Sequence, residues 1–272
     1  MWMLASPAAD DARQRASALD AVVRRIGGYV DNYGARASLF VASERYEQRT
    51  DGSTSARSRQ RTTVAEVALL RVEALGGWQQ FRDVTHVDGR PLEDRTNRLV
   101  DALLSGARGL GEARRISDES SRFNIGLIER NFNVPTTALF FFSSAHHDRF
   151  RIRARDTGKD PWRLDWEEVQ TPTFIRDAQG TSIPTRGSLW VNSADGTIVR
   201  TLLEASMRGR NGQMGSGRVE VTYERHEALR KWLPVRMVEE WTTNMAGGSW
   251  GRVRGTAEYS NYREFTTSAR IK

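Results

Sequence analysis

Residues 187–265 restrict the possible folds more than any other part of the chain, because they alternate apolar and polar residues through several short segments. In one of these segments Val219, Val221 and Tyr223 alternate with charged or hydroxyl residues. Side chains of a strand point alternately to the two faces of a sheet, so such a segment has one apolar and one solvated face. A sheet that is solvated on one face is typically antiparallel, and its other face is covered by helices or left open as a hollow.

The remainder of the chain extends the same pattern on both sides of a helical middle section. Gly, Asn and Asp clusters separate the predicted strands at hairpin spacing. Three stretches have helical periodicity or helix-start signals, 10–34, 91–106 and 111–123, and at 135–144 we favour a short helix over a buried strand. The predicted strands are 38–48, 62–72, 78–87, 150–155, 162–170, 189–191, 197–205, 218–223, 236–244 and 251–267.

These elements predict one α+β domain over residues 10–272. We expect a large, curved antiparallel sheet that forms an unclosed half-barrel, with the N-terminal helix and two or three further helices packed on its concave face. A chain of 272 residues is long enough to bury one large core. Residues 1–9 are expected to be a loose terminus or the remnant of an export signal, since they lack the positive start and the long apolar run of a complete signal.

Composition argues against several classes of function. The formal net charge is +7, but of 41 basic residues only Lys159, Lys231 and Lys272 are lysine, and the arginines are scattered among acidic neighbours. A nucleic-acid surface would need a concentrated basic stripe, so we expect no nucleic-acid partner. Cysteine is absent, which removes disulfides, thiolate zinc sites and a cysteine nucleophile. No apolar run approaches the ~18 residues of a membrane-spanning helix.

The sequence contains no motif that identifies an enzyme, a metal site or a cofactor. It has no Gly-x-Ser-x-Gly elbow, no His-Glu-x-x-His pair and no phosphate-binding glycine loop. His146, His147 and Asp148 could bind a metal only if a second segment supplied ligands, because adjacent side chains on a strand diverge. We interpret them as a polar, exposed turn and expect no catalytic residue, metal or cofactor.

Two carboxylate pairs lie in predicted strands, at Glu167-Glu168 and Glu239-Glu240. Alternation turns one member of each pair toward solvent. An inward Glu168 or Glu240 could form a buried ion pair with an arginine such as Arg82 or Arg122, which is more often structural than catalytic.

Large aromatic side chains are the candidates for a binding site. They could line an apolar hollow, or they could close-pack an ordinary core, and the residue pattern leaves both interpretations open. The candidate ligand-binding residues are Trp78, Phe81, Phe141, Phe142, Phe150, Trp166, Trp190 and Trp241.

Several short motifs in order along nearly the whole chain carry a family resemblance. The motifs are Ala42-Ser43-Glu44-Arg45-Tyr46-Glu47-Gln48, Phe81-Arg82-Asp83-Val84 with Val87-Asp88-Gly89, Glu119-Ser120-Ser121-Arg122-Phe123-Asn124-Ile125-Gly126, Gly187-Ser188-Leu189-Trp190-Val191, Asp195-Gly196-Thr197-Ile198-Val199-Arg200-Thr201, Trp232-Leu233-Pro234-Val235-Arg236-Met237 and Gly255-Thr256-Ala257-Glu258-Tyr259-Ser260-Asn261-Tyr262-Arg263. They resemble a group of uncharacterised secreted proteins of the type found in acidobacteria. More distantly, the plan is similar to the periplasmic lipoprotein-carrier superfamily (LolA-, LppX- and RseB-like).

The resemblance implies a periplasmic or secreted, non-enzymatic protein whose half-barrel hollow takes up a lipid or a lipidated ligand. The alternative is a structural or regulatory module of the cell envelope with a filled core, which binds a protein partner along a sheet edge or a hydrophobic patch.

Overall fold

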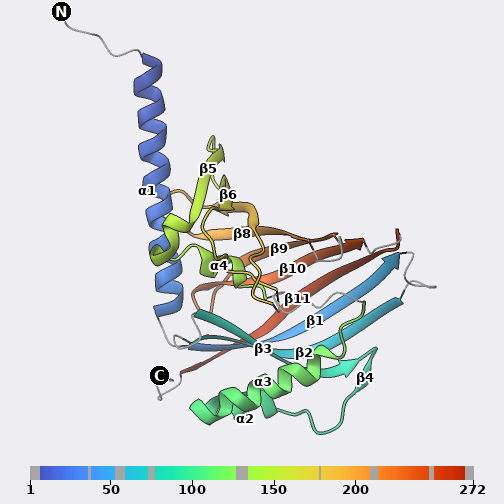
Figure 1. The fold of residues 1–272 in the computed structure, drawn as a ribbon. Coiled ribbons are helices and arrows are strands. Elements are labelled where there is room, and N and C mark those ends of the chain that lie inside the picture. The colour runs from blue at the N-terminus through green and yellow to red at the C-terminus, as the bar shows by residue number, and fades with distance from the viewer. Residues whose placement is uncertain are drawn as a thin grey trace, which may run out of the picture.

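The computed structural model describes residues 7–35, 38–52, 59–72, 77–126, 134–177, 179–208, 214–244 and 248–266. They form one open antiparallel sheet accompanied by a few helices (Figure 1). The helices are α1 (Pro7–Ala35), α2 (Arg98–Leu104), α3 (Ala107–Ser121), α4 (Thr137–Phe141) and the 3-10 helix η2 (Ser144–Arg149). None of these described helices has the length and apolarity needed to cross a bilayer.

The eleven strands that the structure describes pair only with antiparallel neighbours, in the order β4-β3-β2-β1-β11-β10-β9-β8-β7-β6-β5. The first strand, β1, pairs with the last, β11, so the block β1 to β4 and the block β5 to β11 meet at this pair. The strands are β1 (Ser38–Gly52), β2 (Arg59–Val72), β3 (Gly77–Val87), β4 (Arg90–Pro91), β5 (Phe150–Asp156), β6 (Trp162–Glu168), β7 (Thr185–Val191), β8 (Ile198–Arg208), β9 (Met214–His226), β10 (Lys231–Asn244) and β11 (Trp250–Thr266).

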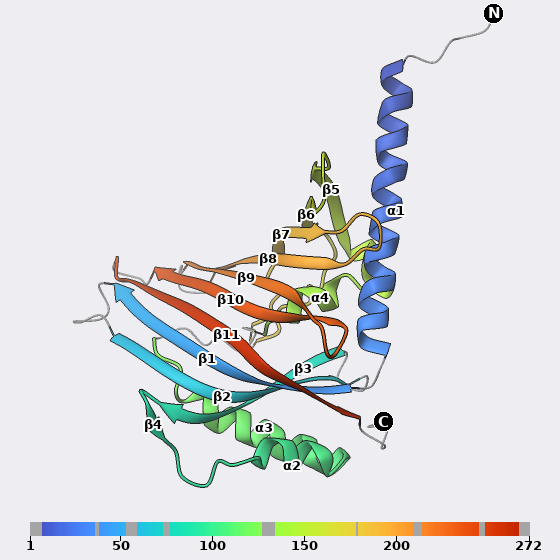
Figure 2. The same cartoon turned by 180° about the vertical axis from the view of Figure 1, so that it is seen from behind.

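The sheet curves around α4. In a flat sheet β3 and β8 would lie on the order of 30 Å apart, because six strand spacings separate them. The five-residue α4 nevertheless contacts both strands. The face that carries α4, here called the inner face, is therefore concave, as the two opposite views indicate (Figure 2). The predicted curved, unclosed antiparallel sheet is confirmed.

The inner face holds the larger part of the core. Alternate residues of β6 to β11 face it, and Leu164, Val221 and Trp241 are almost completely buried there. Helix α1 adds Val22 and Ile26 to the same cluster. Residues 13–18 of α1 are exposed, so the described part of this helix docks through its second half and extends past the sheet (Figure 1).

Helices α2 and α3 lie on the opposite, outer face. Their apolar residues, among them Leu99 and Ile116, pack against Leu39, Ala68 and Phe81. These strand residues alternate with Phe40 and Val67, which face inward. Thus α4 occupies the concave face as predicted. Helix α1 joins the same core from the side, against η2 and the β7–β8 turn, and α2 and α3 cover the convex side of β1 to β3, so the prediction that these helices lie on the concave face is wrong. Apolar residues occupy both faces of these strands, so alternation did not predict which face the helices cover.

Ion pairs fix α2 and α3 to the outer face. The buried Asp83 of β3 accepts hydrogen bonds from Arg98 Nε at 2.7 Å and from Arg95 at 3.0 Å. Arg98 also contacts Glu119 of α3 at 3.1 Å. Helix α3 in addition covers the edge of β3, because the hydroxyls of Ser117 and Ser120 accept hydrogen bonds from backbone N–H groups of that strand.

Most element positions agree with the sequence pattern, and the differences have local causes. Pro91 was expected to begin a helix, but it pairs with His86 in the short strand β4, and the helix begins at Arg98. The predicted helix near Pro135 is confirmed as α4. In β11 the register shifts so that residues 261 and 262 together oppose one residue of β1, which is a β-bulge, and Arg263 then reaches Glu66 at 2.6 Å.

Candidate functional site

Aromatic rings from four segments meet at the β5–β6 end of the inner face. Helix α4 contributes Phe141 and Phe142, and the adjoining strands contribute Phe150 and Trp166. The ring centroid of Trp166 lies 5.8 Å from that of Phe141, 5.4 Å from that of Phe142 and 5.6 Å from that of Phe150. Phe174 stacks on Phe141 at 5.2 Å. These contacts make one aromatic cluster, in which the rings fill the space between α4 and the sheet.

A buried carboxylate holds the segment that carries Phe174. Glu168 at the end of β6 accepts hydrogen bonds from the Phe174 backbone N–H at 2.9 Å and the Thr185 hydroxyl at 3.0 Å, and it contacts Arg149 at 3.2 Å. The guanidinium of Arg149 also lies over the Phe174 ring at 4.5 Å. The prediction of an inward Glu168 in an ion pair is confirmed, with Arg149 as its arginine. Because the carboxylate has several partners, its role is structural.

A second part of the inner face, on β1, β3 and β11, is polar and buried. Glu44 is completely buried, and both its oxygens contact Arg82, at 2.7 and 2.9 Å. The Arg82 guanidinium lies 5.6 Å from the ring centroid of Tyr46. Burial raises the pKa of the neighbouring Tyr259 hydroxyl, and the charge of Glu44 raises it further. We call Glu44, Tyr46, Arg82 and Tyr259 the polar patch.

Glu239 joins the polar patch from β10. Its carboxylate accepts a hydrogen bond from the Tyr46 hydroxyl, and both side chains cross over Gly255 of β11, where a Cβ atom would lie 2.6 Å from the Tyr46 ring. Glycine at 255 therefore makes room for this contact. The inward member of the pair is Glu239, and the expectation for Glu240 is wrong: in the observed register Glu240 faces outward and contacts Arg254 at 3.1 Å.

The structure does not bring all eight candidate aromatic residues together. Phe141, Phe142, Phe150 and Trp166 form the aromatic cluster, and Trp241 belongs to the same inner core over Gly217. Phe81 lies on the outer face beneath α2 and α3. Trp190 also faces outward, where the Arg200 guanidinium lies 3.7 Å from its ring centroid. The side chain of Trp78 lies outside the described residues.

The histidine pair lies in η2, between the aromatic cluster and α1. His146 stands edge-on to Phe140 and Phe174, and burial lowers its pKa. His147 packs against α1 so closely that a Cβ at Gly27 would lie 2.6 Å from its Nε2 atom. Among the described residues no group of three or more His, Cys, Asp or Glu side chains could hold a metal ion. The pair packs η2 against α1 and the aromatic cluster, and His146 and His147 are only half-exposed.

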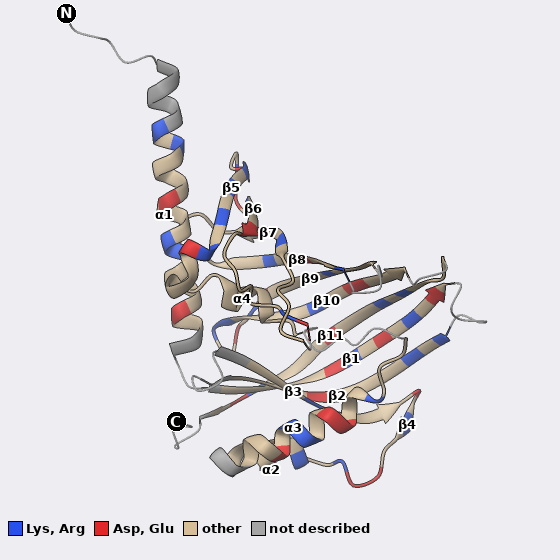
Figure 3. Ribbon diagram, viewed as in Figure 1, with Lys and Arg blue, Asp and Glu red and all other residues tan. Residues whose placement is uncertain are grey.

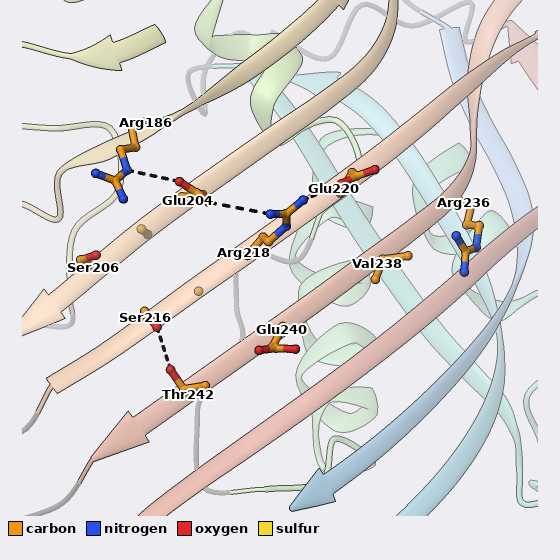
Figure 4. Close-up of a pocket in the computed structure, with 12 residues that line it drawn as sticks. Arg186, Glu204, Ser206, Ser216, Arg218, Glu220, Arg236, Val238, Glu240 and Thr242 are labelled. Atoms are coloured by element: carbon orange, nitrogen blue, oxygen red, sulfur yellow. Dashed lines mark hydrogen bonds and ion pairs between the residues drawn. The ribbon is translucent and has the colours of Figure 1, made fainter. Parts of the chain in front are cut away.

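A hollow lies on the outer face, over β8 to β10. It has a volume of about 760 Å³ and is lined by charged and hydroxyl residues such as Arg218, Glu220 and Arg236 (Figure 4). A neighbouring hollow of about 400 Å³ begins at β5 and shares Arg186 and Arg218 with it. These hollows differ from the apolar one that the sequence suggested, because the aromatic side chains that would line an apolar space pack against each other.

Sequence reasoning did not single out the polar patch as a unit. A signal existed, because Glu44 stands at an inward position between Ala42 and Tyr46 in an alternating strand. A charged residue at an apolar position predicts a buried partner. The partner, Arg82, lies two strands away, and a single sequence does not specify that pairing.

Among known proteins, the chain is matched by solved structures alone. No protein-family model and no curated protein sequence matches the chain. Three of the structural matches are a DUF1329 family protein from Desulfovibrio piger, the S-type phycobiliprotein lyase CPES from Guillardia theta, and lipovitellin from a study of lipid–protein interactions.

The similarity to these structures is low. The Desulfovibrio protein has a TM-score of 0.32 and 10% identity, over 93% of this chain and 94% of its own. The lyase has a TM-score of 0.24 and 8% identity, over 86% of this chain and 93% of its own. Lipovitellin has a TM-score of 0.28 and 9% identity, over 87% of this chain and 26% of its own.

Proposed function

We propose that the protein is an exported, non-enzymatic envelope protein that binds an apolar or amphiphilic ligand on its inner face. The observation that carries this proposal is the cover of the concave sheet. Short elements, namely α4, η2 and the segment that carries Phe174 and Ile175, cover the inner face at the aromatic cluster. A ligand chain that displaces the rings of this cover would meet the apolar floor of β5 to β8.

The contacts between cover and sheet are suited to exchange with an acyl chain. Stacked rings such as Phe141 on Phe174 have no hydrogen bond to lose, so a flexible alkyl chain can replace them. The cover also has polar contacts with the sheet, because Tyr223 donates a hydrogen bond to the Pro135 carbonyl at 2.5 Å and Glu168 accepts one from the Phe174 backbone N–H. Burying a chain there contributes ~0.8 kcal/mol per CH₂, so affinity should rise about fourfold with each added methylene.

Phe141→Ala tests this binding mode. The substitution should reduce the free energy of unfolding by about 3–5 kcal/mol, because it removes a buried ring. It should also strengthen binding of 11-(dansylamino)undecanoic acid roughly three- to tenfold, since a weakened cover populates the binding-competent state more often. Fluorescence titration and competition with unlabelled fatty acids of 8–16 carbons measure this effect.

Phe81→Ala is the matched control. Phe81 is as deeply buried as Phe141 but lies beneath α2 and α3 on the outer face. The variant should lose similar stability without gaining affinity for the probe. Equal gains in both variants would mean that the probe binds to loosened protein in general, and this outcome would refute a ligand site at α4.

A second candidate function has a specific observation in its favour. The aromatic cluster is densely packed, and the two hollows of about 760 and 400 Å³ are polar and lie on the outer face, which suits an interaction module with a filled core. If no fatty acid between 8 and 16 carbons binds to the wild type or to Phe141→Ala, this alternative is favoured.

A further inference from the structure

The two edges of the sheet are built differently. At the β3 edge, hydroxyls of α3 accept the backbone N–H groups of Arg82 and Val84, and β4 pairs with the strand end. At the other edge, β5 has β6 as its one strand neighbour among the described residues, and residues 153–156 are exposed. Such an edge presents unpaired backbone groups that can pair with an added strand.

Strand β5 carries a row of three arginines. Arg151, Arg153 and Arg155 occupy every second position of the sequence, face outward and are exposed. They produce the blue bands on β5 in Figure 3. The register against β6 shifts between Ala154 and Asp156, so Arg155 lies at a β-bulge and the regular strand spacing holds for Arg151 and Arg153. Alternate side chains of a strand stand about 6.6–6.8 Å apart, which is also the spacing of alternate residues in any strand that pairs alongside.

The row is not neutralised by its neighbours on β6. Arg151 contacts Glu167 at 2.5 Å. Asp165 faces Arg153 in the register, but its carboxylate contacts Arg155 at 2.7 Å and Arg163 at 3.2 Å instead. Burial opposes ionisation of Asp165, but hydrogen bonds from Arg155 and Ser188 outweigh it and lower its pKa. Asp156, at the end of β5, lies opposite Arg163, so four arginines face three carboxylates on the outer side of β5 and β6.

The hollow of about 400 Å³ continues this positive surface inward from the edge. It is lined by all three arginines of β5 together with Arg163, Arg186 and Arg218. Farther from the edge, Glu204 contacts Arg186 at 3.2 Å and Arg218 at 4.0 Å, and Arg218 also contacts Glu220 at 2.9 Å, so the positive charge of this hollow is greatest at β5 and β6.

From these features we infer that the β5 edge binds an extended acidic polypeptide segment, which adds a strand antiparallel or parallel to β5 and places alternate carboxylates beside Arg151 and Arg153. A second copy of this chain is a poor occupant, because pairing β5 with β5 would bring two arginine rows together. An anionic membrane or a free phosphate could use the arginines but not the backbone edge. This site is separate from the ligand site proposed on the inner face.

A synthetic nine-residue peptide with aspartate at alternate positions and valine or threonine between them tests the inference. Fluorescence anisotropy at low salt should show binding that weakens as salt rises. We expect Arg153→Glu to weaken binding about tenfold or more, whereas Arg90→Glu, an exposed arginine on the opposite edge strand β4, should change it less than about twofold. Circular dichroism confirms that both variants fold.

Two peptide controls separate the backbone edge from charge alone. The same composition with its aspartates in one block, and the alternating peptide with two central N-methyl groups, should each bind at least about tenfold more weakly. Equal binding of the N-methylated peptide would overturn the inference. Stronger, Arg153-dependent binding of tripolyphosphate or phosphatidylglycerol vesicles would also overturn it and assign the arginines to phosphate groups.

Discussion

Replacing Arg82 by methionine is expected to lower the free energy of unfolding by about 3–5 kcal/mol. Arg82 holds both oxygens of the completely buried Glu44, so its removal leaves a carboxylate without its cation in the interior. The charge of Glu44 raises the pKa of Arg82 despite the opposing effect of burial, which indicates that the pair attracts strongly. Urea denaturation followed by circular dichroism measures the loss.

The double variant Glu44→Gln, Arg82→Met is the control. It removes the buried charge together with its partner, so it should be at least about 2 kcal/mol more stable than Arg82→Met alone. If the single and double variants unfold at the same urea concentration with the same slope, the Glu44–Arg82 pair does not stabilise the inner face as an ion pair.

Gly196→Ala is expected to have a comparably large effect, by separating α1 from the sheet. Gly196 lies in the β7–β8 turn with φ of +78°, and an added Cβ atom would lie 2.3 Å from the backbone carbonyl carbon of Arg25 in α1. Backbone atoms cannot rotate away as a flexible side chain can. We expect the free energy of unfolding to fall by about 3–5 kcal/mol and amide hydrogen exchange in α1 to become faster.

Gly180→Ala separates the clash from the backbone conformation. Gly180 has φ of +80° but no atom within 4 Å of the position of an added Cβ. Alanine there should therefore lower the free energy of unfolding by only about 1 kcal/mol, because of the unfavourable φ. Similar losses in both variants would contradict the close packing of the turn against α1.

The antiparallel sheet and most of its strands could be predicted because alternation reports burial directly. Val219, Val221 and Tyr223 face the core as the pattern indicates. The bulge near Tyr262 could also be predicted, because Tyr259 and Tyr262 break the period of two. The ends of the strands were predicted less accurately than their positions. Met214 to Gly217 extend β9 although small and polar residues dominate there, since pairing with β10 decides the strand's length.

The candidate site was predictable only in its composition. Phe141 and Phe142 of α4 contact Trp166, another of the candidate residues, and the helix that carries them was predicted. Phe81 and Trp190 lie on the outer face instead. Helices α2 and α3 cover Phe81 there, and the Arg200 guanidinium covers the Trp190 ring, so an aromatic residue can occupy either face of these strands. The choice between Glu239 and Glu240 depended on register, which the tertiary pairing sets.

Native mass spectrometry of the protein mixed with saturated fatty acids of 8–16 carbons tests the central proposal most directly. The account predicts one bound molecule per chain and an affinity that rises with chain length, accompanied by an increase in melting temperature. Spectra that contain only the mass of the free chain at every chain length, with an unchanged melting temperature, would contradict ligand binding on the inner face.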